Sequence, residues 1–122
     1  MEARKVVFKS IGEAIAELNR LGSSNSRVMA SRAIHINIML KQIPGAEARF
    51  LKTVYNDIGA EAAISNQAYC EEEGAITDMV IMGTVYQHRE VRRILEDNGR
   101  TRHLIEAIES VLEDSPETVE NE

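Results

Sequence analysis

Residues 74–114 constrain the fold of this chain most strongly, because they carry two amphipathic patterns separated by a glycine stop. Thr84 and Gln87 have the spacing of a capping box, in which side chains satisfy the free N–H groups at a helix start. Apolar residues then recur every three or four positions until Asn98-Gly99 ends the pattern. A second apolar stripe follows at Leu104, Ile105, Ile108, Val111 and Leu112. Two such helices with a short connection predict an antiparallel helical hairpin.

Clustered positive charge follows the same hairpin. Six side chains form a candidate partner-binding surface, here called the basic patch: Arg89, Arg92, Arg93, Arg100, Arg102 and His103. Arg89 and Arg93 are four residues apart, where like charges slightly destabilise an isolated helix. This local conflict suggests the hypothesis that an acidic partner faces the patch. The alternative is a solvated face whose charge is relieved by Glu90, Glu96 and Asp97.

The composition is that of one folded domain. The chain has 122 residues, of which 43% are hydrophobic and 28% charged, so a globular fold is expected rather than disorder. The net charge of −6 argues against a protein that coats nucleic acid generally and against attraction to an anionic membrane. It leaves room for a local basic patch.

Cysteine usage and hydropathy indicate a cytoplasmic protein. Cys70 is the single cysteine, so an internal disulfide cannot form, as suits a reducing compartment. The three glutamates that follow Cys70 disfavour the thiolate that a catalytic cysteine needs. No apolar run reaches the length of a membrane span, and the N-terminal residues lack a signal-peptide core.

Residues 27–43 carry two conflicting patterns. Ile34, Ile36, Ile38 and Leu40 alternate with other residues, which is typical of a strand. The same segment also fits a helix that is apolar nearly all round. We expect a helix over the whole segment, residues 34–41 included, because the neighbouring segments are helical and no second clear strand is available to pair with this one.

The remaining segments also predict helices. Ser10 and Glu13 repeat the capping-box spacing before an apolar stripe that ends at Gly22. Further helices are expected over residues 46–58, 60–73 and 76–82, the last with a strand as the alternative. The expected fold is all-α: one helical domain over residues 1–114 with five to seven helices and at most a short extended segment at the N-terminus. Residues 115–122 are acidic and are expected to be a disordered tail.

Three stretches of the chain look alike. They read GEAIAELNRLGSSNSRVMASRAI from Gly12, GAITDMVIMGTVYQHREVRRIL from Gly74, and GRTRHLIEAIESVLEDSPETVEN from Gly99. Each has a glycine, an apolar helix and a polar break, and residues 63–79 look like the join between two repeats. This pattern of residue classes is similar to armadillo and HEAT helical repeats. The resemblance implies a protein-binding surface without catalysis, and the alternative is an ordinary helical bundle.

A second hypothesis is a DNA-binding helix-turn-helix. Residues 76–82 would form its first helix, Gly83-Thr84 the turn, and residues 86–95 the recognition helix. Glutamine and arginine suit the edges of bases in the major groove. The candidate DNA-reading side chains are Tyr86, Gln87, Arg89, Arg92 and Arg93.

A third hypothesis is a metal-dependent nucleotide hydrolase. Glu71, Glu72, Glu73 and Asp78 resemble the acidic helices of all-helical nucleotide pyrophosphohydrolases, which bind magnesium. The second pair of carboxylates that those enzymes need is missing, since Ala75 and Ile76 occupy its positions. We therefore expect no catalytic residue, no metal site and no cofactor.

The function expected from the sequence is a non-catalytic regulator, adaptor or assembly protein. It would contact another protein with an acidic surface through the basic patch, with self-association as a further expectation. Nucleic-acid binding by the helix-turn-helix is the alternative, and no membrane contact is expected.

Overall fold

The computed structural model describes residues 1–113, without the side chains of Arg100 and Glu113; residues 114–122, which include the predicted disordered tail, lie outside the described part. The chain contains both helices and strands. In order, the elements are α1 (Ile11–Arg20), α2 (Ser26–Ala33), β1 (His35–Pro44), α3 (Gly45–Asp57), β2 (Glu61–Ala63), α4 (Asn66–Tyr69), β3 (Ile76–Thr84), α5 (Val85–Glu96), the 3₁₀ turn η1 (Gly99–Thr101) and α6 (Arg102–Glu113).

The three strands form one antiparallel sheet in the order β1-β3-β2. β1 pairs with β3 from His35 opposite Thr84 to Pro44 opposite Ile76, and β2 pairs with the middle of β3. β1 and β2 therefore run parallel on either side of β3, and α3 makes the crossover between them. This is the strand arrangement of a split βαβ unit.

The sheet overturns the expectation of an all-α fold. Residues 34–41 and 76–82, both expected to be helical, are paired strands instead, and residues 60–73 contain β2 and the single turn of α4 rather than one long helix. The physical reason is that β1 and β3, although far apart in the sequence, pair with each other and bury their apolar side chains together. Ile38 and Leu40 of β1 and Met79 and Ile81 of β3 are all buried on the same face.

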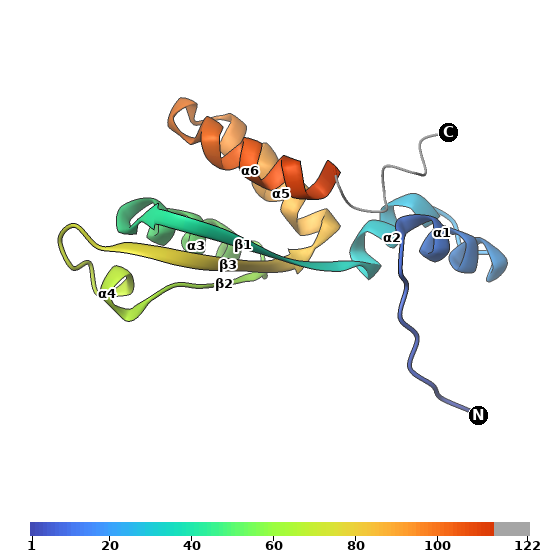
Figure 1. Ribbon diagram of the computed structural model, residues 1–122. Coiled ribbons are helices and arrows are strands. Elements are labelled where there is room, and N and C mark those ends of the chain that lie inside the picture. Colours follow the sequence, from blue (N-terminus) through green and yellow to red (C-terminus); the bar gives the residue numbers. More distant parts are fainter. Residues whose placement is uncertain (114–122) are drawn as a thin grey trace.

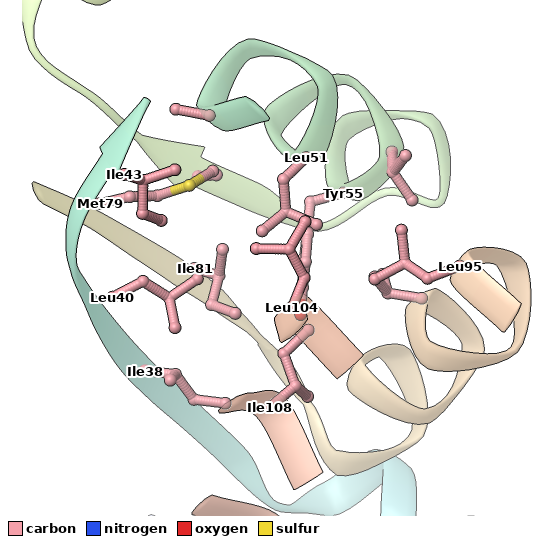
Figure 2. Close-up of a cluster of buried hydrophobic side chains, with 14 of the residues drawn as sticks. Ile38, Leu40, Ile43, Leu51, Tyr55, Met79, Ile81, Leu95, Leu104 and Ile108 are labelled. Atoms are coloured by element: carbon pink, nitrogen blue, oxygen red, sulfur yellow. The ribbon is translucent and has the colours of Figure 1, made fainter. Parts of the chain in front are cut away.

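Three helices cover that face of the sheet. Figure 2 shows Leu51 and Tyr55 of α3, and Leu104 and Ile108 of α6, converging on the inward side chains of the strands. Leu51 and Ile108 are fully buried. Arg92 of α5 pairs with Glu109 of α6, so the predicted helical hairpin is confirmed.

The other face of the sheet carries no helix in the described residues. Its centre is apolar: Met39 lies opposite Val80, and Val80 lies opposite Ala63. Met39 is 54% exposed. Near its C-terminal end, the edge strand β1 is interrupted by a bulge between Leu40 and Ile43. In this bulge, Gln42 has a φ of +59° and donates its backbone N–H to Asp78. Bulges, lysines and prolines discourage pairing with other strands, and Lys41 and Pro44 flank this one.

Residues 1–34 form a separate structural element, here called the N-terminal unit. Figure 1 shows α1 and α2 beyond one end of the sheet, with the preceding residues extending away from the sheet. Ile11, Ala14 and Ala30 are buried against Val85 at the start of α5. Only Ile34 separates α2 from β1, and its carbonyl accepts the backbone N–H of Val85 at 2.9 Å. The unit is thus held against the sheet on one side.

Candidate functional site

The basic patch lies on the hairpin of α5 and α6, but its charge is largely balanced there. Arg89, Arg92 and Arg93 come from α5 and Arg102 and His103 from α6, while the side chain of Arg100 is outside the described part. Arg89 is exposed at the surface.

Four members of the patch pair with carboxylates. Arg93 lies 2.7 Å from Glu90, Arg102 lies 3.5 Å from Glu106, and His103 lies 2.7 Å from Glu47 of α3. Arg92 pairs with Glu109 across the hairpin and lies 3.4 Å from Glu96.

The pKa values follow these contacts. The hydrogen bond that Arg92 donates to Glu109 raises the pKa of the Arg92 guanidinium, and the hydrogen bond that Arg93 donates to Glu90 lowers the pKa of the Glu90 carboxyl. All these groups are partly or fully exposed, so solvent screens each pair and its contribution to stability is small. The sequence places these carboxylates three or four residues from the arginines, or on other helices, and only the fold shows which of them pair.

The helix-turn-helix geometry is not formed, because its first helix is the strand β3. Within the expected recognition helix, the candidate reading residues Gln87 and Tyr86 also have structural contacts. Gln87 completes the capping box: its Oε1 accepts the Thr84 backbone N–H at 2.9 Å, and its own N–H donates to Thr84 Oγ1 at 3.1 Å. The guanidinium of Arg32 in α2 stacks on the ring of Tyr86, 4.2 Å from its centroid.

The acidic residues do not form a metal centre. Glu71, Glu72 and Glu73 lie in the exposed turn between α4 and β3, and Asp78 lies 3.5 Å from Lys41. Within residues 1–113, no three histidine, cysteine, aspartate or glutamate side chains are grouped closely enough to hold a metal ion.

A histidine–tyrosine pair is buried between α3, α5 and the sheet. His88 Nε2 lies 2.8 Å from the Ile36 carbonyl oxygen, which can only accept, so Nε2 carries the proton. His88 Nδ1 therefore accepts the hydroxyl proton of Tyr55 at 2.8 Å. Burial lowers the pKa of His88 and raises that of Tyr55. Both side chains are fully buried, so this pair is part of the core.

The N-terminal unit is the surface that sequence reasoning missed. Of the eleven large hydrophobic side chains that are exposed among the described residues, six belong to these 34 residues: Met1, Val6, Val7, Leu21, Val28 and Met29. The same unit contributes only three of the twenty-one buried hydrophobic residues, namely Ile11, Ala14 and Ala30. Its apolar side chains therefore lie mostly in solvent.

Residues 1–9, here called the N-terminal arm, lie in an extended conformation beside α1. An open cleft separates the arm from the helix and is lined by Arg4, Val6 and Phe8 on one side and by Ala16, Glu17 and Arg20 on the other. Phe8 is half-buried, whereas the preceding residues are exposed. Glu13 ties the root of the arm to α1 by accepting the Lys9 backbone N–H at 3.0 Å.

Charge divides the chain at the same boundary. The N-terminal unit has six basic and three acidic residues, whereas the rest of the chain has eight basic and seventeen acidic residues. The unit thus carries a formal charge of +3 and the remainder −9. No single sequence motif marks this division of charge, but counting the charged residues segment by segment would have found it.

No protein-family description, curated protein or solved structure matches this chain. Among the described residues, no helix is both long and apolar enough to span a bilayer.

Proposed function

We propose that this protein is a non-catalytic regulatory or assembly protein that acts as a homodimer, with the N-terminal units of the two copies packed against each other. The observation that carries the proposal is the exposure of apolar side chains on a unit that buries few of its own. Exposed apolar surface of this kind marks sites of protein association.

The size of the unit supports a second copy as the occupant. Segments below about 40 residues seldom bury enough surface to be stable alone, and oligomerisation is one of the usual remedies. The N-terminal unit has 34 residues and docks through Ala30 and the stacking of Arg32 on Tyr86. That docking leaves Val28 and Met29 of α2 49% and 43% exposed. An identical unit offers matching apolar side chains, and a two-fold arrangement covers both units at once.

The uncovered face of the sheet is the competing dimer surface. It exposes Met39 and carries Val80 and Ala63 in one cross-strand row. This apolar row is short, and it is flanked by the charged residues Lys41 and Asp78. The N-terminal unit exposes more apolar side chains in a smaller segment, which favours it as the interface.

Light scattering on the full chain tests the proposal. The expected mass is twice that of the 13.6 kDa chain. The double variant Val6→Asp, Val28→Asp changes two side chains that are about half exposed, so it should dissociate the dimer while the circular dichroism of the monomer is kept. The control Met39→Asp replaces one exposed apolar side chain by aspartate on the uncovered sheet face and should stay dimeric.

The outcomes separate the alternatives. A monomeric wild-type protein overturns the proposal. A dimer that dissociates with Met39→Asp, but not with Val6→Asp, Val28→Asp, assigns the interface to the sheet face instead.

The basic patch stays a prediction for contact with an acidic partner protein. The fold reduces its free positive charge, since Arg93 and Arg102 already pair with glutamates. A partner would therefore compete with Glu90 and Glu106 for these guanidinium groups. Reversing Arg92 and Arg93 to glutamate should abolish binding of such a partner while leaving the helical signal unchanged.

A further inference from the structure

We propose that the two N-terminal arms of this dimer pair as an antiparallel two-stranded ribbon, and that the ribbon binds the major groove of duplex DNA. The inference rests on the proposed homodimer, because a single arm has no strand partner in the described part of its own chain. It differs from the helix-turn-helix hypothesis in placing the DNA contact on the arm rather than on α5.

The alternation of the arm gives it two distinct faces. In an extended chain, successive side chains point to opposite sides. Arg4, Val6 and Phe8 line the cleft against α1, so they form the inner face. Lys5, Val7 and Lys9 then form the outer face, and all three are exposed. The inner face thus carries Val6 and Phe8 together with Arg4, and the outer face carries Lys5 and Lys9 together with Val7.

Pairing of two arms would bury the apolar side chains of the inner faces and bring the lysines of the outer faces together. An isolated two-stranded ribbon is only marginally stable in water, and packing against helices supplies the missing stability. Val6 and Phe8 of each arm would pack on the helices of the dimer. The outer faces of the two arms would then combine Lys5 and Lys9 from both copies, which gives four lysines on one surface.

The outer lysines are free to meet phosphate. Within residues 1–113, Lys5, Lys9 and Arg27 form no ion pair, in contrast to the paired arginines of the basic patch. Lysine and arginine contacts to phosphate supply most of the affinity of proteins for DNA. These three cations lie on the N-terminal unit, although the arginine-rich segment of the sequence lies elsewhere.

The charge of the whole molecule orients it on DNA. The N-terminal unit carries +3 and the rest of the chain −9, so residues 35–122 as a whole are repelled by the phosphate backbone. Contact is then confined to the arms and the helices next to them. The major groove of B-form DNA is wide enough to admit a two-stranded β-ribbon, and several DNA-binding proteins read it in this way.

Fluorescence anisotropy of a labelled mixed-sequence duplex tests the inference on the full chain. Wild-type protein should bind at low salt, and the affinity should fall steeply as salt is added. The variant Lys5→Ala, Lys9→Ala should lower the affinity at least tenfold. It should also reduce the slope of log affinity against log salt by up to about four, because the dimer loses four cations. The matched control Arg93→Ala, Arg102→Ala removes the same charge from the basic patch and should bind as wild type does.

Light scattering on each variant keeps the two proposals distinguishable. A dimer that binds no duplex at low salt overturns the ribbon and leaves the homodimer in place. A dimer whose binding is lost in the control but kept in the lysine variant also overturns it and assigns DNA contact to the basic patch. Duplex binding by a monomer overturns both the ribbon and the dimer. Protection of guanine N7 from methylation, a major-groove atom, is expected in the wild-type complex, and unprotected N7 atoms contradict the groove assignment.

Discussion

Replacing Tyr55 by phenylalanine tests whether the buried hydrogen bond to His88 stabilises the core. The change removes one hydroxyl group and keeps the ring that packs against α5 and the sheet. It leaves Nδ1 of His88 buried without a donor, since its other ring nitrogen already donates to the Ile36 carbonyl oxygen. An unsatisfied buried acceptor costs about 1–3 kcal/mol, whereas a hydroxyl-sized void adds little.

Urea unfolding measures this cost directly. With a slope of about 1–3 kcal/mol per molar urea, the loss lowers the unfolding midpoint by roughly 1 M at an unchanged slope. The matched control is Tyr69→Phe, because the Tyr69 side chain is 62% exposed and its loss of a hydroxyl should change stability by less than about 0.5 kcal/mol. Equal midpoints for Tyr55→Phe and wild type would refute the assigned tautomer and the energetic role of the pair.

Three further predictions concern the same fold. Burial lowers the pKa of His88 below the unfolded value of about 6.5, so the unfolded chain binds a proton that the folded chain does not. The contribution of His88 to stability should therefore be full above about pH 6.5 and fall as the pH drops toward the folded pKa. In His88→Gln, this part of the loss in unfolding free energy between pH 7.5 and 5.5 should be absent. Thr84→Ala removes the capping box of α5 and should lower the free energy of unfolding by about 1 kcal/mol, and a change below about 0.3 kcal/mol in chemical denaturation would speak against the cap. Leu51→Ala leaves a cavity in the core and should cost about 2–5 kcal/mol, whereas Arg92→Ala, which breaks only a partly exposed pair, should cost less than about 1 kcal/mol by the same measurement.

The helices were largely predictable because their signals are local. The capping box of Thr84 and Gln87 and the apolar stripes of α5 and α6 are each set by residues close together in the sequence. They are confirmed, except that Val111 of the α6 stripe is exposed. The capping spacing at Ser10 is confirmed in part, since the Ser10 hydroxyl accepts the Glu13 N–H, whereas the Glu13 carboxylate accepts the N–H of Lys9.

The strands were missed because their partners are distant. β1 shows alternation, but β3 does not, since Val80 and Met82 on its uncovered face are as apolar as the buried Met79 and Ile81. A strand with apolar residues on both faces has no period of two. Without a recognisable partner, the helical interpretation of residues 34–41 was the better supported one from sequence, and it was wrong.

The two candidate interaction surfaces, the basic patch and the N-terminal unit, also differ in how far they could be recognised from the sequence. The arginines of α5 and α6 are conspicuous in the sequence, but the glutamates that balance them come partly from other helices, such as Glu47 of α3. The apolar residues of α1 and α2 look like core residues in the sequence. Only the fold shows that Leu21, Val28 and Met29 face solvent, because α5 covers one side of the unit and leaves the other side open.

The junction at Ile34 has a mechanical consequence. α2 passes into β1 through this one residue, and the hydrogen bond from Val85 clamps the junction to the place where β3 becomes α5. This short connection therefore restricts rotation of the N-terminal unit relative to the sheet. In the proposed dimer, the separation and relative rotation of the two sheets are then set by the N-terminal contact itself. A change in the twist of either sheet would then also change how the two N-terminal units meet.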